Sequence, residues 1–361
     1  MFNQKGSEIS FRIGKPIPWE SIAAMDLSKK AVAKLMRKQV YLLSQKKKKE
    51  LFKPIENIIH PVRTKLIRKE LKASQLIGKT QDGKHIYLFD YMPNSSVMRE
   101  IGRLRELSFR QVQEGTGNAL DIDSYDRYYR HLILWDEDEL EIIGSYRIGE
   151  AAKILKKHGE AGLYTHSLFK FNPSFIPYLE HSIELGRSFI QPRYQGKRSL
   201  DYLWYGIGAY LYQHPEIRYL IGPVSLSTSW PEPAQKVIAS FYTELFGNNK
   251  ILVDPRLPFD FELIQEFAPF KQVADEENYK QAYAILKALM DDFGVKVPIL
   301  YKQYVELCQP GGCEFLGFNI DPSFSNCVDA LILVHINTIK EKKHQRYIES
   351  HATVFQKRDS A

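Results

Sequence analysis

The stretch His131–Ile148, HLILWDEDELEIIGSYRI, decides the fold class of this 361-residue chain. Two apolar runs, residues 131–135 and 141–148, flank an acidic turn at residues 136–138, which is the pattern of an antiparallel β-hairpin. Helical and strand patterns alternate on both sides of this hairpin. A purely parallel sheet is therefore excluded, and we predict an α/β (α+β) protein with a mixed sheet.

The spacing of apolar residues predicts the remaining elements. Strands are expected at residues 86–89, 169–171, 183–189, 219–224 and 330–339, and helices at residues 97–113, 199–212, 233–246, 278–293 and 298–307. Residues 1–18 predict one short strand with a proline-marked exit, and a helical pattern follows from about residue 20. The tail, residues 341–361, is charged, and we expect it to fray.

The composition is that of a soluble globular protein, with 44% hydrophobic and 26% charged residues. No run approaches the roughly 20 apolar residues of a membrane-spanning helix, and the first residues do not resemble a secretory signal. The three cysteines, Cys308, Cys313 and Cys327, are too few for a disulfide framework and indicate a reducing compartment. We expect a cytoplasmic protein.

The net charge of +7 is concentrated between residues 29 and 72, which include Lys46–Lys49. Such a stretch attracts anionic lipid, nucleic acid or an acidic protein, and the alternative is a solvated helix face. Residues 1–76 carry too few apolar side chains to bury a core alone. We therefore separate them from a main domain at residues 77–340.

Charged residues inside or beside hydrophobic runs mark the candidate site, because charges rarely remain there unless they are paired or used. They fall in four stretches, residues 104–109, 121–126, 144–147 and 184–187. The side chains singled out in them are Arg105, Phe109, Asp121, Asp123, Asp126, Arg147, Glu184 and Arg187. Together they predict a polar acyl-transfer site built on a rigid sheet.

Each of these residues has a plainer alternative. Arg105 and Phe109, four apart on one helix face, suit an anionic or acyl-bearing ligand, or else a surface arginine beside a core phenylalanine. Aspartates at alternate positions suit a cation or an amine, although the pattern is not an EF-hand, and an acidic loop is the alternative. For Arg147 the alternative is an internal salt bridge.

Two more local patterns concern the strand at residues 183–189 and the loop after it. Glu184 and Arg187 face opposite sides of a regular strand, and Gly186 between them indicates a bulge or a close approach by a ligand. The basic loop at residues 193–198 lies between a strand and a helix, as in phosphate sites. The spacing of His131 and Asp136 matches the His-x4-Asp motif of glycerolipid acyltransferases, which we interpret as a coincidence within one strand.

The four stretches, in this order, resemble the GNAT-like ornithine-lipid N-acyltransferases, also called hemolysin-like, and the related acyl-homoserine-lactone synthases. The residues that also carry the resemblance are Tyr125-Asp126, His131-Leu132, Leu203–Ile207, Pro298–Lys302 and Asp321–Phe324. The resemblance implies a mostly antiparallel central sheet flanked by helices, preceded by a basic helical remnant. Residues 11–18 resemble the closing segment of a lysophospholipid acyltransferase domain, which implies the C-terminal half of a bifunctional ornithine-lipid synthase.

The activity implied by the resemblance is transfer of a (3-hydroxy) fatty acyl group from an acyl-carrier-protein thioester to the α-amine of an amino acid such as ornithine, giving a lyso-aminolipid. The implied catalytic residues are Glu184, as the first choice of base, Asp123 and Arg187. The implied substrate-binding residues are Arg105, Phe109, Asp121, Asp126, Arg147 and Ser188.

The donor would bind through its phosphopantetheine at Arg193, Gly196, Lys197 and Arg198. Arg198 occupies a position that is small in coenzyme-A-dependent members, which favours acyl carrier protein over acyl-coenzyme A. The resemblance implies no metal, no permanently bound cofactor, no nucleic acid, and a peripheral place at the inner membrane surface. The alternatives are a coenzyme-A-dependent GNAT enzyme and a non-catalytic basic module that binds membrane or nucleic acid.

Overall fold

The computed structural model describes residues 10–23, 25–44, 51–52, 54–270 and 276–351. The chain divides into two compact units, Met1–Ile59 with Gly117–Ala119, and His60–Thr116 with Leu120–Ala361. The second unit includes α3 (Thr64–Lys72), which lies within the predicted N-terminal segment of residues 1–76, and β1 (Gln75–Lys79), which spans the predicted boundary. Among the described residues, none of the helices is long and apolar enough to cross a bilayer.

The described part of the first unit contains two helices, α1 (Trp19–Ala23) and α2 (Lys29–Leu42). The sequence predicted one helix here, but Ser28 starts a new one, since its hydroxyl accepts a hydrogen bond from the Ala31 amide at 3.3 Å. The short strand predicted near the start is wrong for residues 10–18, which form no strand. Residues 1–9 and Lys46–Lys49 lie outside the described residues.

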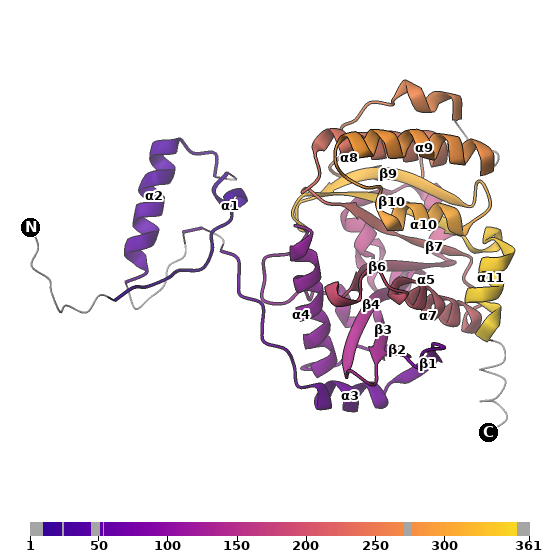
Figure 1. The fold of residues 1–361 in the computed structure, drawn as a ribbon, viewed down its shortest axis with the longest axis horizontal. Coiled ribbons are helices and arrows are strands. Elements are labelled where there is room, and N and C mark those ends of the chain that lie inside the picture. Colours follow the sequence, from indigo (N-terminus) through magenta and orange to yellow (C-terminus); the bar gives the residue numbers. More distant parts are fainter. Residues whose placement is uncertain (1–9, 24, 45–50, 53, 271–275, 352–361) are drawn as a thin grey trace, which may run out of the picture. The chain divides into compact units, whose positions relative to one another are not determined.

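The second unit is built on an eight-stranded sheet with the strand order β1-β2-β3-β4-β6-β7-β10-β9 (Figure 1). After β1, the strands in sheet order are β2 (His85–Asp90), β3 (Arg130–Asp136), β4 (Glu141–Glu150), β6 (Ser182–Ile190), β7 (Tyr219–Leu226), β10 (Cys327–His335) and β9 (Cys313–Asp321). Among the strands of the described residues, only β6 and β7 pair in parallel. The predicted hairpin is confirmed in β3 and β4, and so is the mixed, mostly antiparallel sheet.

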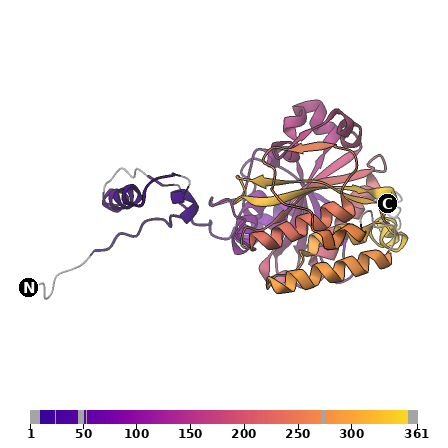
Figure 2. The same cartoon turned by 90° about the horizontal axis from the view of Figure 1, so that it is seen from above.

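Helices cover both faces of this sheet. The first face is covered by α7 (Ser199–Gln213), α8 (Glu232–Phe246), α9 (Glu276–Asp292), α10 (Ile299–Leu307) and α11 (Glu341–Tyr347). The second face is covered by α3, α4 (Ser96–Gln111), α5 (Ala151–His158), α6 (Ile176–Leu179) and a small sheet of β5 (Phe169–Phe171) and β8 (Val253–Pro255). Figure 2 shows the orange helices α8 and α9 together on one side of the strands.

Three differences from the predicted elements have simple causes. The elements α3, β1 and β9 were missed, and β1 and β9 are the edge strands, whose patterns are short or interrupted. The last long strand, expected at residues 330–339, begins instead at Cys327 and ends at His335. The expected fraying is wrong for residues 341–351, because Tyr347 donates a hydrogen bond to Asp201 of α7 at 2.7 Å.

The parallel pair β6 and β7 provides the opening for the site. Their pairing is short and joins only Ser182–Glu184 to Tyr219–Ile221. On its other side, β6 carries a bulge, where the register against β4 shifts between Ser145 and Arg147. The two strands therefore separate towards their carboxyl ends and leave a gap in the middle of the sheet.

Candidate active site

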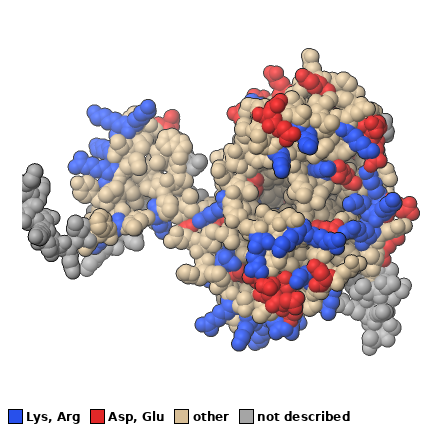
Figure 3. All heavy atoms as spheres, viewed as in Figure 1, with Lys and Arg blue, Asp and Glu red and all other residues tan. Residues whose placement is uncertain are grey.

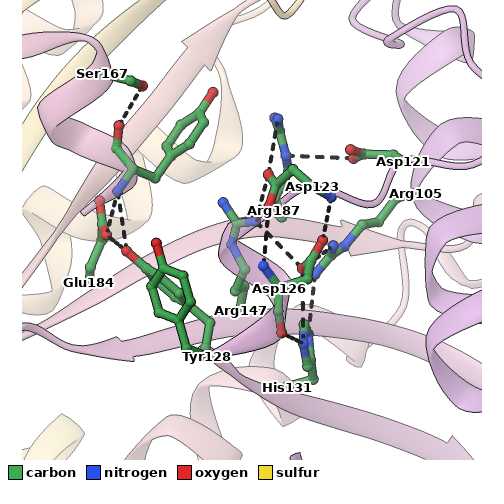
Figure 4. A network of polar contacts seen from close by, with 12 residues as sticks. Arg105, Asp121, Asp123, Asp126, Tyr128, His131, Arg147, Ser167, Glu184 and Arg187 are labelled. Carbon is green, nitrogen blue, oxygen red and sulfur yellow. Dashed lines mark hydrogen bonds and ion pairs between the residues drawn. The ribbon is translucent and has the colours of Figure 1, made fainter. Parts of the chain in front are cut away.

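A buried network of charged side chains lies on the second face of the sheet, beside this gap (Figure 4). Arg105 of α4 is fully buried and donates a hydrogen bond to Asp126 at 2.8 Å. Arg147 of β4 donates to both oxygens of Asp123, at 2.7 and 2.8 Å, and to Asp126 at 3.4 Å. The interpretation of Arg105 as a surface residue is therefore wrong, and the internal salt bridge considered for Arg147 is confirmed.

The acidic loop that holds these arginines is fixed by its own backbone. The Asp123 amide donates to the Asp126 carboxylate at 2.8 Å, and the Asp126 amide donates back to Asp123 at 3.1 Å. The loop lies directly on α4, because the Asp121 amide donates to the Gly102 carbonyl at 3.0 Å, and a Cβ on Gly102 would lie 2.7 Å from Ile122. Burial alone would raise the pKa of Asp126, but Arg105 and Arg147 hold it well below its usual range.

His131 belongs to the same network, whereas Asp136 does not. The His131 ring accepts a hydrogen bond from Arg105 at 3.3 Å, and its other nitrogen donates to the Asp126 carbonyl at 3.3 Å. Burial and the charge of Arg105 lower the pKa of His131 to about 4, so the ring is neutral at pH 7. Asp136, at the far end of β3, pairs with Lys84 at 2.8 Å. The interpretation of their spacing as a coincidence is confirmed.

Glu184 is engaged by a neighbouring loop. Its carboxyl group accepts hydrogen bonds from the amides of Tyr164 (3.1 Å) and Thr165 (2.6 Å) and from the Tyr129 hydroxyl. The side chain is 1% exposed. Tyr164 then donates from its own hydroxyl to Asp321 at 2.6 Å, which connects the loop to β9. Glu184 therefore anchors the segment of residues 163–167.

The bulge in β6 turns Arg187 towards the gap. Arg187 has a φ of 45°, in the left-handed region that a non-glycine residue rarely adopts. Its guanidinium lies 4.5 Å from the ring centre of Phe324 and 5.0 Å from that of Tyr164. The carboxylates of Asp121 and Asp123 are 3.6 and 3.8 Å away, too far for hydrogen bonds. The predicted bulge next to Gly186 is confirmed, and Arg187 is the residue that it redirects.

A cavity of about 110 Å³ occupies the gap. The strand β6 supplies residues 185–188 to its wall and β7 supplies residues 223–225. Apolar and tyrosine side chains of the first face, Tyr146, Leu300 and Tyr304, line one part of it. Arg187, Glu114, Asp329 and Tyr164 line another part, with Phe109 and Phe324. The cavity is therefore accessible to groups from both faces of the sheet.

The two carboxyl groups of the cavity wall have unusual electrostatics. Burial raises the pKa of Glu114 to about 8, and the nearby Asp329 adds to the rise, while Arg187 opposes it. Burial also raises the pKa of Asp329 to about 7, to which Asp321 contributes. Asp329 accepts hydrogen bonds from the Ser225 hydroxyl at 2.6 Å and from the Cys327 thiol at 3.7 Å. Groups with such pKa values can exchange protons near neutral pH.

The predicted carrier-binding loop lines a second hollow, of about 520 Å³. Arg193, Lys197 and Arg198 line it, while Gly196, with a φ of 73°, makes the turn before α7. The acidic turn after β3 lies across from the loop, and Arg193 pairs there with Glu139 at 3.2 Å and Glu141 at 3.0 Å. Lys197 and Arg198 are thus the cations of this loop without such an ion pair in the described part of the chain.

The structure thus divides the predicted site residues into three groups. Arg105, Asp121, Asp123, Asp126, Arg147 and Arg187 form the network, with Glu184 next to it. Phe109, Arg187 and Ser188 line the cavity. The third group, Arg193, Gly196, Lys197 and Arg198, lies in the loop before α7.

Sequence reasoning missed Glu114, Asp329 and Ser225. Asp329 carries the same signal that marked Arg147, a single charge within an apolar run, here residues 327–335. It was overlooked because the strand was predicted to begin at residue 330. Glu114 follows the end of α4 in a polar segment, where no sequence pattern distinguishes it from an exposed acid.

Comparison with known proteins agrees with this geometry. A family model described as an acetyltransferase (GNAT) domain matches residues 104–205. The chain is 32% identical over 310 residues to a glycine N(alpha)-acyltransferase of Phocaeicola vulgatus, covering 82% of this chain and 94% of that protein. It is 33% identical over 316 residues to a glycine N(alpha)-acyltransferase of Bacteroides thetaiotaomicron, covering 82% and 92%.

Similarity to other proteins is more distant. An L-ornithine N(alpha)-acyltransferase of Agrobacterium fabrum is 29% identical over 244 residues, covering 65% of this chain and 74% of that protein. Among solved structures, the acyl-homoserine-lactone synthase LasI matches 41% of this chain and 74% of its own, with 15% identity and a TM-score of 0.29.

Proposed function

Because the chain belongs to the GNAT-type N-alpha-acyltransferases of amino acids, we propose that it transfers a fatty acyl group from acyl carrier protein to the α-amine of glycine. The observation that carries this proposal is the cavity in the gap between β6 and β7, with Arg187, Glu114 and Asp329 in its wall. The first candidate for the acyl group is a long 3-hydroxylated chain. The product is then an N-acyl amino acid, which is a lyso-aminolipid.

The acceptor binds on the second face of the sheet. Arg187 is the cation of the cavity wall, and its Nε is buried without a hydrogen-bond partner among the described residues. A guanidinium in this state binds a carboxylate well, so Arg187 holds the carboxylate of the amino acid. The acceptor's ammonium group then lies within the cavity, near the thioester.

The small cavity favours glycine over ornithine. Its volume of about 110 Å³ is well below the roughly 300–1,000 Å³ of typical ligand pockets. The relatives named for glycine also match more of this chain, 82% at 32% and 33% identity, whereas the relatives named for ornithine match 30–69% of it at 26–31% identity. Ornithine is the second candidate acceptor, because the family includes that activity.

The donor approaches from the loop before α7. Lys197 and Arg198, together with the free amides at the start of α7, suit the single phosphate of phosphopantetheine and the acidic surface of a carrier protein. The thioester then reaches the gap past Ser188, and backbone amides at the bulge of β6 bind the oxyanion. That residues 1–76 are the end of an O-acyltransferase domain stays a prediction.

The direct test is acyl transfer with purified protein. A 3-hydroxyacyl carrier protein, and coenzyme A carrying the same acyl group, are each incubated with glycine or ornithine, and the products are identified by mass spectrometry. We expect N-acylglycine as the main product, with the carrier protein as the better donor. Absence of amide with every acceptor would overturn the proposal, and equal turnover of both donors would overturn its donor part.

A charge reversal tests the donor loop by itself. Lys197→Glu and Arg198→Glu are compared with Lys236→Glu on α8, whose lysine pairs with Glu232 away from the loop. We expect the loop variants to raise the KM for acyl carrier protein about tenfold. Turnover of the same acyl group on N-acetylcysteamine, which has no phosphate, stays unchanged. Equal effects on both donors would show that the loop does not bind the carrier.

We also propose that α2 holds the enzyme at an anionic membrane surface. The helix carries Lys29, Lys30, Lys34, Arg37 and Lys38 without an acidic residue, and it buries none of its side chains. Each such charge contributes about 1 kcal/mol near anionic lipid. Sedimentation with vesicles of anionic and of zwitterionic lipid tests this. Binding that is equal for both lipids, or that survives reversal of Lys34, Arg37 and Lys38, would contradict it.

A further inference from the structure

The amine of an amino acid is mostly protonated at neutral pH, so the acyl transfer requires a group that removes a proton. The sequence predicted Glu184 for this task, with Asp123 as the second choice. In the structure both oxygens of Glu184 accept hydrogen bonds from the loop of residues 163–167 and from Tyr129, and neither Glu184 nor Asp123 lines the cavity. Asp123 is paired with Arg147.

The carboxyl groups in the cavity wall are those of Glu114 and Asp329. They come from separate parts of the fold, Asp329 from β10 and Glu114 from the segment that follows α4. Asp329 lies opposite Ser225 in the β10–β7 register, and the Ser225 hydroxyl fixes its carboxylate at 2.6 Å. Both carboxyls therefore border the small space in which an amine would meet the thioester.

We propose that Asp329 and Glu114 are the acid–base pair of the reaction, with Asp329 taking the proton of the acceptor's ammonium group and Glu114 supplying a proton to the departing sulfur. This inference rests on the proposed function, because it requires an amine acceptor and a thioester donor in the cavity. Asp329 is assigned to the amine because Ser225 of β7 orients it and because it lines the cavity from β10, the strand that pairs with β7.

The protons balance over one turnover. The ammonium gives one proton to Asp329, and the amine then attacks the thioester carbon, so that a C–N bond forms. The C–S bond breaks as the tetrahedral intermediate collapses, and the thiolate takes a proton from Glu114. The nitrogen loses a second proton as the amide forms, and Glu114 takes it up. Asp329 releases its proton to water, so both carboxyl groups return to their starting states.

The charges around the pair suit this exchange. The groups that face Asp329 and Glu114 from the surrounding elements are Arg187 of β6, Asp321 of β9, Cys327 of β10, Tyr301 of α10 and Tyr164. Arg187 is the cation among them. With pKa values of about 7 and 8, Asp329 loses its proton before Glu114, so near pH 7.5 the pair holds about one proton.

Asp329→Asn and Glu114→Gln test the pair, and Glu314→Gln is the matched control. Glu314 lies on the same sheet, in β9, but pairs with His335 at 2.7 Å and is not part of the cavity wall. For glycine at pH 7.5, we expect Asp329→Asn to lower kcat/KM about 100-fold to 10,000-fold. The pH profile of this variant lacks the limb that reports the base. Glu114→Gln lowers kcat/KM less than Asp329→Asn does. The control, Glu314→Gln, leaves kcat/KM and the pH profile unchanged.

Hydroxylamine separates catalysis from structure, because it is unprotonated at neutral pH and needs no base before attack. We expect Asp329→Asn to use hydroxylamine within about tenfold of the wild-type rate. An equal loss with hydroxylamine and glycine, or an unchanged pH profile with glycine, would overturn the pair. If instead the wild-type protein acylates neither glycine nor any other amine, the proposed function itself has failed. Thermal unfolding of each variant shows whether it is folded.

Discussion

The buried network and the cavity wall both contain carboxyl groups withdrawn from water, Asp126 and Asp329 almost wholly and Glu114 in part, yet the two regions treat them in opposite ways. In the network, Arg105 and Arg147 donate hydrogen bonds to Asp126 and keep its pKa below the usual range. In the cavity wall, burial raises the pKa values of Glu114 and Asp329, although the charge of Arg187 opposes the rise.

This difference separates groups that hold the fold from groups that can take part in chemistry. A buried carboxylate that is paired with guanidinium groups keeps its charge and fixes geometry. A buried carboxyl group without such a partner changes protonation near pH 7, which is what proton transfer to and from an amine requires. The two regions share Arg187, which lies near Asp121 and also lines the cavity.

The largest expected effect is loss of stability when the network loses an arginine. Arg147→Met leaves Asp123 and Asp126 short of a buried positive charge, which costs about 3–5 kcal/mol of the free energy of unfolding. Urea unfolding followed by circular dichroism measures this. Arg193→Met, at a half-exposed arginine, is the control and should change stability by less than about 1 kcal/mol. A small effect of Arg147→Met would mean that the network does not hold the fold.

The second effect is a dependence of stability on pH that comes from the cavity. The folded state binds more protons than the unfolded state between pH 3.8 and about 7, because the pKa of Asp329 is raised over that range. The free energy of unfolding therefore falls as the pH rises through this window, by about 2–4 kcal/mol. Asp126 acts in the opposite direction, since its lowered pKa removes stability only as the pH falls below about 4.

Asp329→Asn keeps the neutral shape of the side chain and should reduce this slope, leaving the part that comes from the raised pKa of Glu114. Unfolding in urea at pH 5 and pH 8 gives the comparison for the wild type and the variant. The variant should be the more stable of the two at pH 8. An identical slope in both proteins would show that Asp329 does not titrate in this range.

The sequence was sufficient for the network and for the centre of the sheet. Arg105, Arg147 and the aspartates stand out as charges beside apolar runs, and the hairpin has a clear period. Pairing partners were beyond its reach, because which acid meets Arg147 depends on how the loop of residues 121–126 lies on α4. The hydrogen bonds of Glu184 were out of reach for the same reason, because the amides that donate to it lie on a segment about 20 residues earlier in the chain.

The cavity was harder to predict than the network. Its carboxyl groups come from residues 114 and 329, more than 200 positions apart, and only the strand order brings β10 beside β7. A bulge that turns Arg187 inward is likewise a property of the register between β4 and β6. Sequence periodicity reports faces of single elements, whereas a cavity depends on where two strands stop pairing.

The third effect concerns Glu184, which the sequence predicted to be the base. Glu184→Gln replaces one carboxylate oxygen, which accepts hydrogen bonds, by an amide NH2 group, which donates them. This group faces the N–H of Tyr164 or Thr165, or the hydroxyl of Tyr129, so hydrogen bonds are lost. The loss lowers the free energy of unfolding by about 1–3 kcal/mol. We expect a lower melting temperature, while the pH profile of kcat/KM keeps its shape. If the variant loses the acidic limb of the profile, which reports the base, without losing stability, Glu184 is the base and Asp329 is not.

The smallest effect on stability is expected for Gly186→Ala. A Cβ at Gly186 would meet no atom within 4 Å, and its φ is not in the left-handed region, so the fold accepts alanine within about 1 kcal/mol. The added methyl group enters the cavity wall, where about 110 Å³ must receive the acceptor and the thioester. The KM for glycine should therefore rise at unchanged stability, in contrast to Arg147→Met, which loses stability first. A lower melting temperature with an unchanged KM would show that Gly186 stabilises the fold. It would also contradict the proposal that glycine binds in this cavity.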